Sequence, residues 1–119
     1  MKTDMRLHPR VSVDLPAELE PFHGDCVDVR LIYLSLSGAL VEGQGELEAL
    51  LGARRERVAG IPLELNLHFG LEAASVHCHC RVVHSRRLAQ DCFQVGLKIL
   101  SLPSQSQDAL NRYIEARLG

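Results

Sequence analysis

The feature that most constrains the fold is a period of two in the hydrophobic pattern, which recurs along most of the chain. Over residues 11–15 and 63–69, apolar and polar side chains alternate without interruption. Successive side chains of a β-strand point to opposite faces, so this pattern predicts strands with one buried face. Six segments have this or a similar strand-forming character: residues 11–15, 26–34, 39–42, 63–69, 76–84 and 92–100. Six strands at this spacing predict an antiparallel barrel or sandwich.

Helical periodicity is confined to the C-terminal end of the chain. The apolar side chains that recur there at helical spacing are Leu110, Tyr113, Ile114 and Leu118. Such a stripe marks a helix that packs one face against a core. We therefore predict a mainly β fold, a six-stranded antiparallel β-barrel with a C-terminal α-helix over residues 105–118.

Two connections are predicted to be irregular. Residues 42–60 contain four glycines, and we expect a mobile excursion there with at most a short helical turn over 46–51. Residues 85–90 are expected to join the last two strands. Both connections carry clustered basic residues, which we expect to be solvated; the alternative is that they supply additional contacts to a phosphate. These residues are Arg54, Arg55, Arg57, Arg86 and Arg87.

Composition narrows the class of protein. The chain has 119 residues, 46% of them hydrophobic, and a formal net charge of −2, as expected for one globular domain that is not a general polyanion binder. We expect a flexible arm over residues 1–10 and a single domain over 11–119. No apolar run is long enough to span a bilayer, and none of the four cysteines forms a Cys-x-x-Cys pair. We therefore predict a cytoplasmic protein with free thiols, no membrane insertion and no nucleic-acid polymer as a partner.

Two arginines precede the first predicted strand. Arg6 and Arg10 are four residues apart, but Pro9 disfavours a helix, so we expect an extended arm. A guanidinium group can donate two parallel hydrogen bonds to a phosphate or to the edge of a guanine. The pair is therefore suited to hold a guanine nucleotide, although from the spacing alone a solvated basic tail is the more common outcome.

A bend is predicted between the second and third strands. Ser35 offers a hydroxyl group, and the missing side chain of Gly38 allows a ligand or another backbone to approach closely. The alternative is a hairpin turn with no further role, because serine and glycine are common in turns.

A run of alternating histidine and cysteine follows, His77-Cys78-His79-Cys80. On a strand the two cysteines share one face with the neighbouring valines, which predicts that they belong to the core, while both histidines face outward. We expect no metal here, because the spacing of structural zinc motifs is absent. The alternative is a zinc site on His77 and His79, completed by a neighbouring strand.

Taken in this order, these segments resemble the PilZ domain family of cyclic di-GMP receptors. Arg6 and Arg10 match its Arg-x-x-x-Arg motif, and Ser35 and Gly38 match its Asp/Asn-x-Ser-x-x-Gly motif. Residues 95–100 resemble its closing strand, with isoleucine in place of phenylalanine. The resemblance implies that the two arginines clamp phosphate and guanine while Ser35 and Gly38 line the site. It implies no cofactor, and an effect on motility, biofilm or exopolysaccharide that passes through a protein partner.

One position departs from the family pattern, since Tyr33 stands where the family has Asp or Asn. A phenol lacks the two acceptor oxygens of a carboxylate, but its ring can stack on a base. Two functions follow from this: a receptor or adaptor that binds cyclic di-GMP with Tyr33 in its site, or a degenerate interaction module, for example in pilus assembly, that binds it weakly or not at all. No arrangement of nucleophile and base is visible, so we expect no enzymatic activity.

Overall fold

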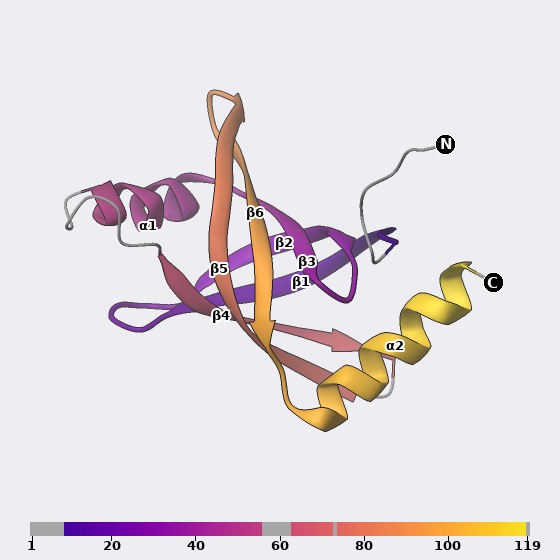
Figure 1. Cartoon of the computed structure of the whole chain (residues 1–119). Coiled ribbons are helices and arrows are strands. Elements are labelled where there is room, and N and C mark those ends of the chain that lie inside the picture. The colour runs from indigo at the N-terminus through magenta and orange to yellow at the C-terminus, as the bar shows by residue number, and fades with distance from the viewer. Residues whose placement is uncertain (1–8, 56–62, 73, 119) are drawn as a thin grey trace.

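The computed structural model describes residues 9–55, 63–72 and 74–118. Six antiparallel strands form a closed barrel in the order β1-β2-β3-β6-β5-β4, and two helices lie toward opposite ends of the view in Figure 1. The strands are β1 (Val11–Pro21), β2 (Val27–Leu34), β3 (Gly38–Gly43), β4 (Glu64–Leu71), β5 (Ala74–Ala89) and β6 (Cys92–Ser101). The helices are α1 (Gly45–Arg55) and α2 (Ser104–Leu118). The predicted barrel with a C-terminal helix is confirmed.

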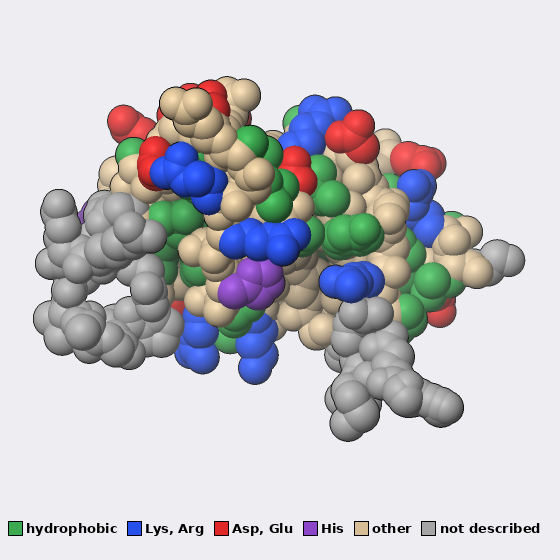
Figure 2. Space-filling view, turned by 90° about the horizontal axis from the view of Figure 1, so that it is seen from above, with side chains coloured by type: hydrophobic (Ala, Val, Ile, Leu, Met, Phe, Trp, Pro, Cys, Tyr) green, Lys and Arg blue, Asp and Glu red, His purple; other side chains and the backbone are tan. Residues whose placement is uncertain are grey.

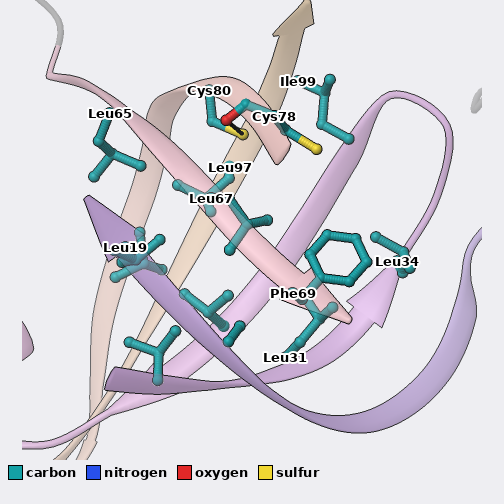
Figure 3. Close-up of a cluster of buried hydrophobic side chains, with 14 of the residues drawn as sticks. Leu19, Leu31, Leu34, Leu65, Leu67, Phe69, Cys78, Cys80, Leu97 and Ile99 are labelled. Atoms are coloured by element: carbon teal, nitrogen blue, oxygen red, sulfur yellow. Dashed lines mark hydrogen bonds between the residues drawn. The ribbon is translucent and has the colours of Figure 1, made fainter. Parts of the chain in front are cut away.

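The core fills the inside of the barrel. The inward side chains of alternate strand positions are fully buried, among them Leu19, Leu31 and Leu67 (Figure 3). Burying a leucine side chain contributes about 1.5–3 kcal/mol, so this row of residues is the main source of stability.

The two cysteines of the histidine–cysteine run belong to this core, as predicted. Cys78 and Cys80 are 1% and 0% exposed and lie beside Ile99 in Figure 3. The contact with Cys78, together with burial, raises the pKa of the Cys80 thiol, so this thiol stays protonated and unreactive. All four cysteines of the chain are free.

The connection after β3 differs from the prediction, because it contains an eleven-residue helix, α1. Leu47 is fully buried, and the helix packs over β2, β3 and β6. Glu46 and Glu48 lie in the first turn, where carboxylates interact favourably with the helix dipole. The expected short turn over 46–51 is thus the first part of a longer helix, and the expected irregular course is wrong for residues 45–55. The remainder of that prediction, residues 56–60, lies outside the described residues.

The last two strands are longer than predicted. β5 continues to Ala89 and pairs with β6 up to Cys92, so only Gln90 and Asp91 form the turn. The expected connection over 85–90 is therefore mostly strand, and the β5–β6 hairpin projects beyond the barrel (Figure 1). The sequence does not predict this part of β5 as a strand, because its side chains are exposed on both faces and show no alternation of buried and exposed residues.

Helix α2 packs mainly against β5 and begins one residue earlier than predicted. Leu110 and Ile114 are buried, as their spacing predicts, whereas Leu118 is 53% exposed at the end of the helix. The prediction that Leu118 joins the packed face is therefore wrong. Neither helix in the described part of the chain combines the length and the apolar character needed to cross a bilayer.

Candidate functional site

The bend between β2 and β3 is held by the hydroxyl group of Ser35. Its Oγ accepts hydrogen bonds from the backbone N–H groups of Ser37 and Gly38, at 3.2 and 3.0 Å, and lies 3.3 Å from the Gly38 carbonyl oxygen. The Ser35 N–H also donates to that carbonyl, at 2.9 Å. Ser35 is only 7% exposed, so its hydroxyl group shapes the bend and has little capacity left for a ligand. Ser37 is exposed, and its hydroxyl group lies 3.4 Å from that of Ser35, so it is the hydroxyl group of the bend that solvent can reach.

Gly38 is required by a close approach of backbone. A Cβ atom at this position would lie 2.8 Å from the Leu97 carbonyl oxygen on β6. Of the two reasons that a glycine is expected here, a ligand or another chain segment, the structure supports the second. The consequence for the site is a flat floor where β3 and β6 meet.

Arg10 and Tyr33 meet at one side of this bend. The Arg10 guanidinium carbon lies 5.0 Å from the centroid of the Tyr33 ring, a cation–π contact. Tyr33 therefore holds the arginine through its ring, where a carboxylate would hold it through an ion pair. Arg6, the other predicted arginine, lies outside the described residues.

These residues border a pocket of about 190 Å³ on the outer surface of the barrel. Cross-strand pairing places Tyr33 beside Leu40, Leu40 beside Gly96, and Gly96 beside His84. This row crosses four strands, so it measures roughly 14 Å from end to end. The pocket is lined by Arg10, Tyr33, Leu34, Ser35, Ser37, Gly38, Ala39, Leu40, Val83, His84, Gly96 and Leu97.

The sequence does not predict a role in this pocket for His84. Its imidazole covers Gly96 so closely that a Cβ atom there would lie 2.1 Å from Nε2 of His84. The pairing of β5 with β6 shifts between Val82 and His84, and that of β2 with β3 shifts between Leu31 and Tyr33. Such β-bulges redirect side chains, and here they flank the pocket on both sides. Alternation alone cannot reveal them.

The charge of the pocket suits an anion. None of the described residues that line it is acidic, while Arg10 and His84 supply basic groups. A larger hollow of about 390 Å³ near α1 is lined by Asp28, Glu42, Glu46 and Asp91 as well as Arg30. Those carboxylates repel phosphate, so size alone does not identify the site. Figure 2 shows Lys and Arg side chains across the middle and lower part of one face, whereas acidic and basic side chains are mixed along its upper part.

The two outward histidines of β5 have different partners. His79 Nε2 lies 2.8 Å from Glu64 Oε1, whereas His77 Nδ1 lies 2.7 Å from His68 Nδ1. The structure therefore does not bring His77 and His79 together around one metal. Within residues 9–55, 63–72 and 74–118, no group of three His, Cys, Asp or Glu side chains is placed to hold an ion.

Comparison with known proteins places the fold among solved structures. The inhibitor of motility MotI/DgrA of Bacillus subtilis matches with a TM-score of 0.74 and 14% identity over 98% of this chain and 52% of that one. The PilZ domain of YcgR from Escherichia coli, solved with c-di-GMP, matches with a TM-score of 0.66 and 12% identity over 97% and 92%. The K. pneumonia MrkH–c-di-GMP complex matches with a TM-score of 0.72 and 12% identity over 98% and 53%.

This chain thus spans about half the length of MotI/DgrA and of MrkH. At 12–14% sequence identity, the similarity to these three structures is a similarity of fold. A search of the curated proteins found no match. The model of the PilZ domain family, in contrast, matches residues 4–116, nearly the whole chain. Together with the closed six-stranded barrel and its C-terminal helix, this match shows that the chain belongs to the PilZ domain family.

Proposed function

We propose that this protein is a receptor or adaptor for cyclic di-GMP and that the ligand binds in the pocket bordered by Arg10 and His84. Arg10 donates its parallel N–H groups to a phosphate or to the O6 and N7 atoms of a guanine, and Arg6 adds a second guanidinium. Two structures similar in fold, those of the YcgR PilZ domain and of MrkH, were solved with this ligand.

The observation that carries the proposal is the position of Arg10. Its guanidinium group lies over the Tyr33 ring at the border of a pocket whose described lining has no carboxylate. An arginine held by a ring keeps its N–H donors free, whereas an arginine in an ion pair has already used them. Since no carboxylate of the described residues borders this pocket, the group is positioned there and available to an anion.

The remaining motif residues have separate roles in this proposal. Ser35 is a positioning residue, because its hydroxyl group holds the bend. Gly38 keeps the floor flat next to β6, and Tyr33 and His84 offer π surfaces at the two ends of the row. The exposed hydroxyl group of Ser37 is the one at the bend that faces a ligand.

The effect of the ligand is proposed to pass to a protein partner, with motility, biofilm or exopolysaccharide as the output. The N-terminal arm, residues 1–10, would order over the bound dinucleotide and change the surface presented to that partner. The PilZ domain is a binding module, and we propose that this chain has no catalytic activity and binds cyclic di-GMP without a cofactor. Four free cysteines support a reducing compartment, the cytoplasm.

Calorimetric titration with cyclic di-GMP tests the proposal. We expect saturable binding that weakens as the salt concentration rises, since phosphate charges are neutralised. Arg10→Ala should weaken binding about ten- to hundredfold, the loss expected for a charged hydrogen bond. Arg112→Ala, which removes an exposed arginine from α2, is the matched control and should bind like the wild type.

A flat titration of folded protein would overturn the receptor function and leave the degenerate interaction module. Tyr33→Asp then adds a separate test of the tyrosine. Tighter binding would mean that the ring is a lost contact, and weaker binding would mean that the ring supports binding, by contact with the ligand or by positioning Arg10.

A further inference from the structure

A pair of histidines lies on the outer face of the barrel, apart from the pocket described above. His68 on β4 and His77 on β5 are direct cross-strand partners. Their Nδ1 atoms are 2.7 Å apart, and their rings meet at 63° with centroids separated by 4.9 Å. Two Nδ1 atoms can face each other at this distance only if one of them offers a lone pair.

The second ring nitrogen of His68 also makes a hydrogen bond, and this bond identifies the nitrogen that carries the lone pair. Nε2 of His68 lies 2.8 Å from Glu20 Oε1 on β1, and a glutamate side chain at neutral pH is a carboxylate, which can only accept a hydrogen bond. Nε2 therefore carries the proton, and in the neutral ring the lone pair is on Nδ1, directed at His77. A carboxylate behind a histidine in this way is the arrangement that orients metal-binding imidazoles in proteins.

We propose that Nδ1 of His68 and Nδ1 of His77 bind one divalent transition-metal ion of the zinc class. Without metal the proton between the two rings lies on Nδ1 of His77; on binding it leaves this nitrogen and the neutral ring carries its proton on Nε2, so that both Nδ1 atoms offer a lone pair to the ion. Two nitrogen ligands on tetrahedral zinc, with bonds of 2.0–2.1 Å, are about 3.3 Å apart, about 0.6 Å more than the distance between these two atoms. A small rotation of two solvent-accessible side chains provides that difference, since the His68 side chain is 27% exposed and His77 is an exposed residue.

Among the residues that the structure describes, the coordination sphere is incomplete, because no third ligand belongs to the cluster. The other positions on the metal therefore take water or a donor group of another molecule. The metal would link β4 to β5 beside α2, since the backbone N–H of His77 donates to the buried Ser106 Oγ at 3.2 Å. Binding should thus stabilise the docking of α2 as well as the two strands.

His79 provides the matched control for this site. It lies on the same strand and the same face, and it has its own carboxylate partner, Glu64, at 2.8 Å. It lacks a facing imidazole, because its cross-strand partner is Asn66. If any exposed imidazole bound the metal, removing His79 would weaken binding as much as removing His77.

The experiment is a calorimetric titration of tag-free full-length protein with Zn²⁺, repeated with Co²⁺ by absorption spectroscopy. We expect one ion per chain and a higher melting temperature with metal, because binding to the folded state stabilises it. His68→Ala and His77→Ala should each abolish this binding, and His79→Ala should leave it unchanged. Glu20→Gln should weaken it about 10- to 100-fold, the usual effect of losing such a carboxylate. Circular dichroism confirms that each variant is folded.

Three results would overturn the proposal. They are no binding by the wild type, binding that survives in His68→Ala or His77→Ala, and a thiolate-to-cobalt charge-transfer band, which would place the metal on a cysteine. Cyclic di-GMP binding is not involved in any of them, so this site and the proposed function fail or succeed separately.

Discussion

At the scale of single residues, Tyr33 changes how the arginine of the site is held. The family pattern has Asp or Asn at this position, whereas the tyrosine here presents the face of a ring 5.0 Å from the Arg10 guanidinium carbon. A cation–π contact at an exposed site is worth about 0.5–1 kcal/mol, enough to bias a side chain without fixing it. The pair is therefore held in place loosely, and a ligand can recruit the arginine at small cost.

This arrangement predicts the effect of two substitutions at Tyr33 on cyclic di-GMP affinity. Tyr33→Phe keeps the ring and should leave the dissociation constant within about twofold of the wild type. Tyr33→Leu removes the ring and should weaken binding about two- to fivefold, the equivalent of 0.5–1 kcal/mol. Calorimetry measures both. Equal affinity for Tyr33→Leu and the wild type would show that the ring does not position Arg10.

Gly38 gives a prediction about stability. Gly38→Ala places a Cβ atom 2.8 Å from a backbone oxygen of β6, which cannot move without disturbing the barrel, so we expect a loss of about 1–3 kcal/mol in the free energy of unfolding. Gly70→Ala is the control, because open space surrounds that position on β4. It should be neutral or stabilising by up to about 1 kcal/mol. Urea unfolding measures both, and equal stabilities would refute the close approach.

At the scale of elements, alternation predicts strands only where one face is buried. β4 was predicted closely, since Leu65, Leu67 and Phe69 face the core. The outer half of β5 is not predicted as a strand, because its side chains are exposed on both faces and the hydrophobic pattern has no period there. Helix α1 is stabilised largely by the burial of Leu47, which one short segment of sequence does not distinguish from a loop residue.

The outer face of β4 and β5 gives a prediction about pH. The hydrogen bond from His79, with a smaller contribution from Arg81, lowers the pKa of Glu64 below its usual value of 4.5. A carboxyl group with a lower pKa in the folded state adds stability above pH 4.5, and that stability is lost as the pH falls through the folded value.

We therefore expect the urea midpoint of the wild type to fall below about pH 4.5 more steeply than that of Glu64→Gln. Glu115→Gln, an exposed position on α2, should follow the wild type. Parallel curves for the wild type and Glu64→Gln would contradict the contribution of this carboxylate.

At the scale of the whole molecule, closing the barrel brings distant segments to one pocket. Arg10, the bend at residues 33–40, the start of the hairpin at 83–84 and residues 96–97 all line it. The arginine and the Ser–Gly bend could be predicted, because local chemistry and the order of motifs identify them. His84 could not, since it reaches the pocket through a bulge in β5 that depends on pairing with β6.

The role of Ser35 in the structure also differs from the role that the sequence predicts. The pattern identified Ser35 as a ligand contact, while the hydrogen bonds to Ser37 and Gly38 assign it to the bend itself. Such a role depends on the turn geometry, which the residue types alone do not specify.

The most direct test of the central claim is to map the ligand onto the barrel by NMR. Backbone amide resonances are followed while cyclic di-GMP is added to the full-length protein. We predict that the largest shifts occur at residues 33–40, 83–84 and 96–97, with little change around the acidic hollow at residues 42–46 and 91–92. Shifts concentrated at that hollow, or a spectrum that does not change, would contradict the claim that Arg10 and the Ser–Gly bend form a nucleotide site.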